Sequence, residues 1–107
     1  MRRVVVESPY AGDVEANVRY ALLCIRDSLA RGEAPIASHL LYPRVLDDDN
    51  PSQRELGIKA GLTWYEVADA CVVYTNLGIS SGMERGMKEA ARCGVPIEKR
   101  KLPGHYE

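Results

Sequence analysis

Short apolar runs alternate with longer amphipathic segments along this chain, and the alternation limits its possible folds more than any other feature. The apolar runs cover residues 4–6, 35–41, 70–75 and 95–97. Runs of this length are typical of β-strands that are covered on both faces. Because a helical segment separates each pair of runs, we expect parallel strands joined by right-handed crossovers. The sequence therefore predicts a single α/β domain over residues 1–107 with a small parallel sheet of about four strands.

The intervening segments carry the local signals of helices. Asp13 can cap a first helix whose apolar residues recur on one face. Asn50 and Pro51 form a typical helix start, and the second helix is expected to run to about residue 67. Residues 81–84, Ser-Gly-Met-Glu, match a capping box that would open the third helix.

The composition is that of an ordinary globular protein and excludes several classes. Of the 107 residues, 46% are apolar, which is enough for one hydrophobic core. The net charge is −1 and there is no basic stripe, so neither nucleic acid nor a membrane is expected as a partner. The apolar run at the start is too short for a signal peptide or a membrane span, so we expect a cytoplasmic protein. Cys24, Cys71 and Cys93 show no CxxC spacing and are expected to be free thiols, two of them buried.

Polar and small residues gather in the loops that follow the predicted strands. In a parallel sheet these loops meet at the carboxyl ends of the strands, where ligands bind. The loop over residues 75–82, Thr-Asn-Leu-Gly-Ile-Ser-Ser-Gly, is the most informative of them. Gly78 and Gly82 allow the backbone to approach a ligand closely, and the helix amino terminus that follows suits a phosphate or a carboxylate. Ser80 and Ser81 would add hydroxyls there, although Ser81 would equally serve as the cap of its own helix.

Glu7 stands at the end of the first predicted strand, among apolar neighbours. A carboxylate in such a place needs a partner or a function. It would act as a general base, as a nucleophile or as an acceptor of a hydrogen bond from a ribose; alternatively, it pairs with a nearby arginine such as Arg19. Tyr10 would stack on a base or simply cover the first helix. His39 would reach the same edge of the sheet, or it has a structural role.

Two further features have a less specific interpretation. Asp47, Asp48 and Asp49 suggest a divalent metal, but three consecutive loop carboxylates without further ligands are usually only solvated, so no metal and no cofactor are expected. Trp64 and Tyr65 form an aromatic pair that we expect to serve helix packing or a subunit contact rather than base stacking, with the pair exposed beside an apolar helix face. Such a pair favours a homo-oligomer.

Two stretches of the sequence resemble one known group of proteins. Residues 4–21, VVVESPYAGDVEANVRYA, and residues 67–97, VADACVVYTNLGISSGMERGMKEAARCGVPI, are similar to the nucleoside 2-deoxyribosyltransferase-like superfamily and to small phage and bacterial domains related to it. The shared pattern is a strand that ends in a Pro turn and Gly-Asp, and later an apolar strand, a small-residue loop, Ser-Gly, a helix and Gly-x-Pro. The resemblance implies a Rossmann-like or flavodoxin-like three-layer sandwich, usually oligomeric, with a pocket for a nucleoside or a nucleotide.

The resemblance also implies a mechanism. In the superfamily a glutamate of the last helix acts as the nucleophile, and the bond between base and deoxyribose is cleaved or exchanged. That glutamate lies four residues after the glycine of the Ser-Gly motif, and the matching position here is Gly86. Either Glu7 or Glu84 takes its place, or the domain binds its ligand without cleaving it.

Two functions are therefore considered, beside a purely structural role. The first is an N-glycosidase or deoxyribosyltransferase, a hydrolase or transferase that acts on a nucleotide with Glu7 as its catalytic carboxylate. The second is a module that binds or sequesters a nucleotide-derived signal without catalysis, as a sensor or a phage protein would. The expected ligand-binding residues are the same in both cases: Ser8, Tyr10, Gly12, His39, Asn76, Gly78, Ser80, Ser81, Gly82 and Glu84.

Overall fold

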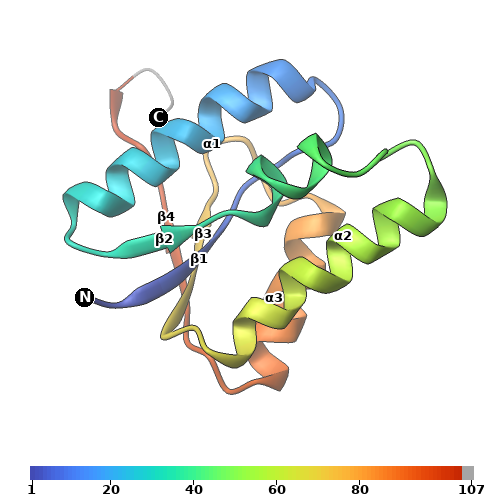
Figure 1. Cartoon of the computed structure of the whole chain (residues 1–107). Helices are drawn as coiled ribbons and strands as arrows, with labels where there is room; N and C mark the ends of the chain where they lie inside the picture. Colours follow the sequence, from blue (N-terminus) through green and yellow to red (C-terminus); the bar gives the residue numbers. More distant parts are fainter. Residues whose placement is uncertain (105–107) are drawn as a thin grey trace.

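The strands of this computed structural model, which describes residues 1–104, form one sheet in the order β2-β1-β3-β4. They are β1 (Arg3–Glu7), β2 (Ala34–Ile36), β3 (Ala70–Tyr74) and β4 (Ile97–Arg100), and every neighbouring pair is parallel (Figure 1). β1 and β3 lie at the centre, and both are mainly apolar because both of their faces are covered. The predicted α/β domain with a parallel sheet of about four strands is confirmed.

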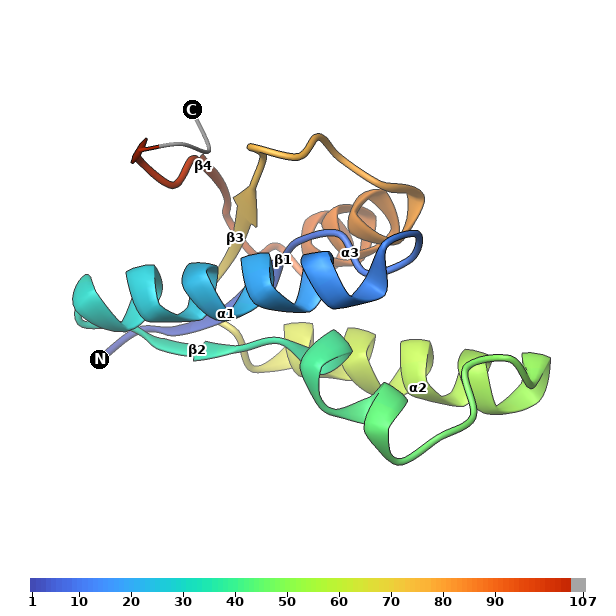
Figure 2. The ribbon, with the colours of Figure 1, turned by 90° about the horizontal axis from the view of Figure 1, so that it is seen from above.

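Helices cover both faces of the sheet, so the domain has three layers. α1 (Val14–Ala30) lies on one face, and α2 (Pro51–Thr63) and α3 (Ser81–Arg92) lie on the other (Figures 1 and 2). The strand order explains this division. The connection from β1 to β2 runs in one direction across the sheet and the later connections run in the other, so right-handed crossovers place their helices on opposite faces. Three short 3-10 helices complete the connections: η1 (Ser38–Leu40), η2 (Tyr42–Arg44) and η3 (Trp64–Glu66).

Strand alternation divides the interior into two apolar layers. Val4 belongs with Tyr20 to the layer beneath α1. Val5 points the opposite way and belongs with Met83 to the layer beneath α3. Glu7 continues the row of Val5, so its carboxylate enters the second layer at the carboxyl end of β1.

Side chains cap the first two helices as the sequence predicts. At the start of α1 the Asp13 carboxylate accepts the N–H of Ala16 at 3.2 Å. At the start of α2 the Asn50 side chain accepts the N–H of Ser52 at 3.1 Å, and Pro51 is the first helical residue. These caps satisfy amide groups that have no partner inside the helix.

Two predicted boundaries near α2 are wrong. The second strand, expected over residues 35–41, ends at Ile36, because the chain turns there into η1 and packs Ser38 closely against Gly61. The second helix, expected to reach residue 67, ends at Thr63 and tightens into η3. The first change brings η1 against α2, and the second places Tyr65 of η3 in the apolar layer beneath the sheet.

The last strand is also displaced from its predicted place. It was expected over residues 95–97, but β4 covers Ile97–Arg100. Pro96 has no N–H to donate and contributes only its carbonyl, which accepts the N–H of Cys71 at 2.8 Å. The polar residues of β4 fit an edge strand because their side chains reach solvent or an ion-pair network.

The cysteines lie largely as predicted, since Cys24 and Cys71 are buried free thiols and Cys93 is half-buried. In the part of the chain that the structure describes, no helix has both the length and the apolar character needed to span a membrane.

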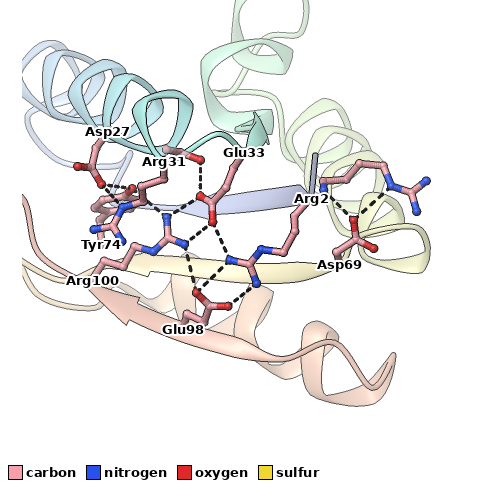
Figure 3. Close-up of polar contacts among 10 residues, drawn as sticks. Arg2, Asp27, Arg31, Glu33, Asp69, Tyr74, Glu98 and Arg100 are labelled. Atoms are coloured by element: carbon pink, nitrogen blue, oxygen red, sulfur yellow. Dashed lines mark hydrogen bonds and ion pairs between the residues drawn. The ribbon is translucent and has the colours of Figure 1, made fainter.

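A buried ion-pair network, which the sequence analysis missed, joins β4 to the segment before β2 (Figure 3). The Arg100 guanidinium donates two hydrogen bonds to the Glu33 carboxylate, at 2.7 and 2.6 Å. Ser28 donates a third at 2.8 Å, and Arg2 bridges Glu33 and Glu98 at 2.6 and 2.7 Å. Only 7% of the Glu33 and Arg100 side chains is exposed. Arg100, with help from Arg2 and Ser28, lowers the pKa of Glu33 to about 2, so this carboxylate is always charged near neutral pH.

We expect Arg100→Met to lower the free energy of unfolding by about 3 kcal/mol, because it leaves the buried Glu33 carboxylate without its main partner. Urea denaturation at pH 7 measures the loss. Adding Glu33→Leu should recover part of it, since the uncompensated charge is then gone. Arg19→Met is the matched control, because Arg19 pairs with Glu15 on the surface, and it should cost less than about 0.5 kcal/mol. A loss in Arg100→Met no larger than in this control would contradict the expectation.

Candidate functional site

A pocket of about 350 Å³ opens at the carboxyl edge of the sheet, on the side of α2 and α3. Its walls come from segments far apart in the sequence: the loop after β1, η1, η2, the inner face of α2 and the first turns of α3. Figure 2 shows the loop after β1, drawn in blue, beside α3, drawn in orange. The strand order reverses between the adjacent strands β1 and β3, because the chain leaves β1 toward β2 on one side and later adds β3 on the other. Open α/β sheets bind ligands at the carboxyl ends of the strands beside such a point.

Glu7 lines this pocket from the end of β1 and has two close contacts. The Tyr65 hydroxyl in η3 donates a hydrogen bond to Glu7 Oε2. On another side the carboxylate lies against the backbone of Gly86 in α3, so closely that a β-carbon added to Gly86 would stand 2.5 Å from Glu7 Cδ. Real β-carbons do not approach other atoms so closely. Position 86 must therefore be glycine as long as Glu7 keeps this place.

Burial sets the charge of Glu7. Removal from water raises the pKa of this carboxyl to about 7, and the hydrogen bond from Tyr65 opposes the rise. Glu7 therefore passes between its charged and neutral forms near neutral pH. Tyr65 lies 3.2 Å from Cys71 Sγ, and burial together with the nearby Glu7 raises the tyrosine pKa far above its ordinary value. Its hydroxyl thus stays protonated and keeps donating to Glu7.

Ser8, Tyr10 and His39 form a second polar group in the pocket wall. Ser8 Oγ and His39 Nε2 are 2.7 Å apart, so this pair links the loops after β1 and β2. The Tyr10 ring stands edge-on to the imidazole, with 6.4 Å between the ring centroids. Burial lowers the pKa of His39 to about 4, so the ring is neutral near neutral pH. Because Ser8 occupies Nε2, the other ring nitrogen is the one that would meet a ligand, as donor or acceptor according to the tautomer.

The amino end of α3 supplies the third predicted part of the wall, with Ser80, Ser81 and Gly82. The expectation that Ser81 caps the helix is wrong, because the cap is Ser80, whose hydroxyl accepts the N–H of Met83 at 3.3 Å. Ser81 is the first residue of the helix and is exposed. Its hydroxyl is therefore not used for capping and lies at the pocket.

Four of the predicted ligand-binding residues do not line this pocket: Gly12, Asn76, Gly78 and Glu84. Asn76 accepts hydrogen bonds from the Tyr20 hydroxyl and from the N–H of Leu102, both at 2.8 Å, so it joins α1 to the segment after β4. Gly12 and Gly78 have φ angles of 102° and 87°, which glycine adopts readily. They shape the two loops, and a direct role of these four residues in binding stays a prediction.

The pocket also contains residues that the sequence analysis did not single out. α2 presents Arg54, Gly57 and Gly61 to it, at spacings of three and four that place them on one helical face. α3 adds Arg85, and η3 adds Tyr65, which the sequence had indicated only as part of an aromatic pair and not as a pocket residue. Two glycines four residues apart inside an ordinary helix were the available signal for this face, since glycine weakens a helix unless close packing needs it.

The interpretation of the aromatic pair needs a correction. Tyr65 is buried, with 1% of its surface exposed, because it fills the layer beneath the sheet and reaches Glu7. Trp64 is 41% exposed, and its indole N–H donates to the Tyr42 hydroxyl at 2.9 Å. The homo-oligomer inferred from this pair stays a prediction.

The structure also shows the surroundings of Arg19 and of the acidic loop. Arg19 lies 3.3 Å from Glu15 and so does not pair with Glu7. In the acidic loop, Asp47 accepts the N–H of Asp49 at 3.0 Å, which is an ordinary local turn contact. Within residues 1–104, no three His, Cys, Asp or Glu side chains come together in a way that would hold a metal ion.

The sheet order, the three layers and the pocket at the switch point define a Rossmann-like or flavodoxin-like α/β protein. The structure is similar to that of a 2-deoxyribosyltransferase from Bacillus psychrosaccharolyticus, with a TM-score of 0.67 and 16% sequence identity over 96% of this chain and 74% of that chain. The predicted resemblance is thereby confirmed for the fold. The chain belongs to a family described as a domain of unknown function, DUF7768, whose model matches residues 2–100. No curated protein matches the sequence significantly.

We expect the raised pKa of Glu7 to make stability depend on pH. A carboxyl whose pKa is raised by folding stabilises the native state below its unfolded pKa of about 4.5, and this contribution is lost as the pH rises through 7. Relative to Glu7→Gln, the wild type should lose about 3 kcal/mol between pH 4 and pH 8. Urea denaturation of both proteins across this range measures the difference. A difference that does not change with pH would contradict the burial of an ionisable Glu7.

Proposed function

We propose that the pocket binds a nucleoside or a nucleotide and that the Glu7 carboxylate attacks C1′ of its sugar, so that the N-glycosidic bond is cleaved or the sugar is transferred. The observation that carries this proposal is the position of Glu7, between Tyr65 and Gly86 in a pocket at the carboxyl edge of the sheet. The fold supports it, because the structurally similar 2-deoxyribosyltransferase is described as a biocatalyst for the synthesis of nucleosides.

The relation between Glu7 and Gly86 favours Glu7 as the nucleophile. The superfamily resemblance implies a nucleophilic glutamate at the position of Gly86. A side chain at that position would begin in the space that the Glu7 carboxylate fills. The same functional group thus reaches this part of the pocket from β1 instead of α3. Glu84 is a weaker candidate, because it is exposed and does not line the pocket.

The chemistry needs one carboxylate and one acceptor. A Glu7 oxygen forms a bond to C1′ while the bond from C1′ to the base nitrogen breaks, and the base takes the bonding electron pair and a proton from solvent. A water molecule or a second base then attacks C1′, loses a proton, and releases Glu7 as a carboxylate. The Tyr65 hydroxyl keeps the attacking side chain in one orientation.

The other walls suit the rest of such a ligand. A pocket of about 350 Å³ is of the size that holds small-molecule ligands in proteins. With the sugar over Glu7, the base would lie toward Tyr10 and the neutral His39, which offer a ring to stack on and a polar edge. The 5′ end of the sugar would then point toward Ser81 and Gly82 at the amino end of α3.

A second candidate function is binding without catalysis. It is favoured by the hydrogen bond between Tyr65 and Glu7, which would equally fix Glu7 as an acceptor for a sugar hydroxyl. A module that senses or sequesters a nucleotide-derived signal would need this same pocket and no nucleophile.

Glu7→Gln distinguishes the two functions. The amide keeps the size of the side chain and its ability to accept from Tyr65, but it lacks the charge that attacks C1′. We expect wild-type protein to release base from a panel of nucleosides and nucleotides, and Glu7→Gln to do so at least about a thousandfold more slowly with little change in ligand affinity. Chromatography measures the released base, and Glu15→Gln, which removes an exposed carboxylate of α1, should behave as the wild type.

The amounts of bound ligand and of released base distinguish the two candidate functions. Bound ligand without any released base would support the second candidate function. Equal release by wild type and Glu7→Gln would contradict the assignment of Glu7 as the nucleophile.

Tyr65→Phe tests how the nucleophile is tuned. The Tyr65 hydroxyl lowers the pKa of Glu7 by donating to the carboxylate, so its removal should raise that pKa above about 7. Because the nucleophile must be charged, the rise of kcat/KM with pH should shift to higher pH in Tyr65→Phe. Carbon-13 NMR of the Glu7 carboxyl gives the same shift without any turnover. An unchanged or lowered pKa would contradict this role of Tyr65.

A further inference from the structure

Two arginines line the pocket from its two helical walls, Arg54 from α2 and Arg85 from α3. Among the described residues, the Arg54 guanidinium has neither a hydrogen bond nor an ion pair. Arg85 lies 2.5 Å from Glu55 of α2, and this exposed ion pair joins the two helices beside the pocket. Neither arginine is needed by the carboxylate chemistry proposed for Glu7.

The charges of the pocket wall are unbalanced around these arginines. Apart from Glu7, the acidic residue of the wall is Asp48. Burial keeps Glu7 close to half neutral near pH 7, and His39 carries no charge there. Because Glu55 already pairs with Arg85, the positive charge of the pocket wall that has no partner among the described residues is that of Arg54.

The Arg54 charge enters the pocket from the start of α2, at a distance along the helix from the residues that hold Glu7. On α2, Arg54 stands two helical turns before Gly61, which corresponds to about 10 Å along the helix axis. Gly61 in turn lies one turn before Tyr65, the residue that holds Glu7. A ligand that reaches both Glu7 and Arg54 must carry a reactive carbon at one end and an anionic group several bonds away. A nucleoside 5′-phosphate has this layout, with C1′ at one end of the sugar and the phosphate beyond the other.

We propose that Arg54 and Arg85 bind the phosphate of a nucleoside 5′-phosphate, so that the pocket selects phosphorylated ligands over neutral nucleosides. This inference rests on the proposed function and specifies its substrate class. Arg54 gives up no partner when it binds, and Arg85 exchanges the Glu55 carboxylate for the phosphate. A guanidinium pairs well with phosphate because its N–H groups match two of the phosphate oxygens.

The test compares the four common 2′-deoxynucleosides with their 5′-monophosphates by isothermal titration, in a Glu7→Gln background that prevents turnover. The monophosphates should bind at least about tenfold more tightly than the nucleosides. Adding Arg54→Gln should remove most of this preference and change the affinity for nucleosides by less than about twofold. Arg26→Gln is the matched control, since Arg26 is exposed on α1 at the other face of the sheet and its loss changes the net charge equally.

Glu55→Gln supplies a readout that a purely structural role of the arginines would not produce. It removes the carboxylate that competes for Arg85, so the affinity for monophosphates should rise while that for nucleosides stays the same. Equal affinities for nucleosides and monophosphates, or an Arg54→Gln variant that weakens both equally, would overturn the inference and leave the proposed function standing. If neither class of ligand binds, the proposed function fails and this inference fails with it.

Discussion

The burial of one carboxylate at the end of a central strand is the constraint on which the rest of the site depends. Glu7 follows Val5 on the same face of β1, so the alternation of the strand sends its side chain into the layer beneath α3. A charged group there has a high cost in free energy unless it finds space and a hydrogen-bond donor. Gly86 provides the space and Tyr65 provides the donor. The strand β1, the helix α3 and the 3-10 segment η3 are remote from one another in sequence, and all three contribute contacts to this one side chain.

Three helical glycines, Gly57, Gly61 and Gly86, also determine the shape of the pocket. A β-carbon at Gly57 would lie 3.3 Å from Leu46, and one at Gly61 would lie 2.9 Å from the Ser38 β-carbon. These two glycines let the segments after β2 approach α2 closely, and Gly86 does the same for the carboxylate of Glu7. Glycine inside a helix lowers its stability, but at these positions it allows the close approach that forms the walls of the pocket.

The fold follows from local patterns in the sequence, whereas contacts between distant segments leave no local mark. Alternating apolar runs gave the parallel sheet, and the short-range capping signals of Asp13 and Asn50 were interpreted correctly, because both depend on neighbours within a few residues. Glu7 was noticed because a carboxylate is unexpected after an apolar strand. Its partner Tyr65 was missed, since 58 residues separate the two and an aromatic pair after a helix has no local mark of burial. Ser80 and Ser81 were interchanged as caps because either serine satisfies the local pattern, and only the path of the loop into α3 decides between them.

Two carboxylates of this chain show how the environment, rather than the residue type, sets the charge of a buried carboxyl group. The Glu33 side chain is almost fully buried. The Arg100 guanidinium nevertheless lowers its pKa to about 2, so the carboxylate stays charged. All of its oxygens are committed to donors, so it has nothing to offer a ligand. Glu7 has one hydrogen bond, no cationic partner among the described residues, and a pKa near 7. Under the proposed function, the positive charge that develops on the sugar in the transition state would supply the charge that Glu7 lacks and would stabilise its charged form at that point. Under the proposed function, an arginine paired with Glu7 would stabilise the carboxylate before the ligand binds, so that less stabilisation would be gained as charge develops on the sugar.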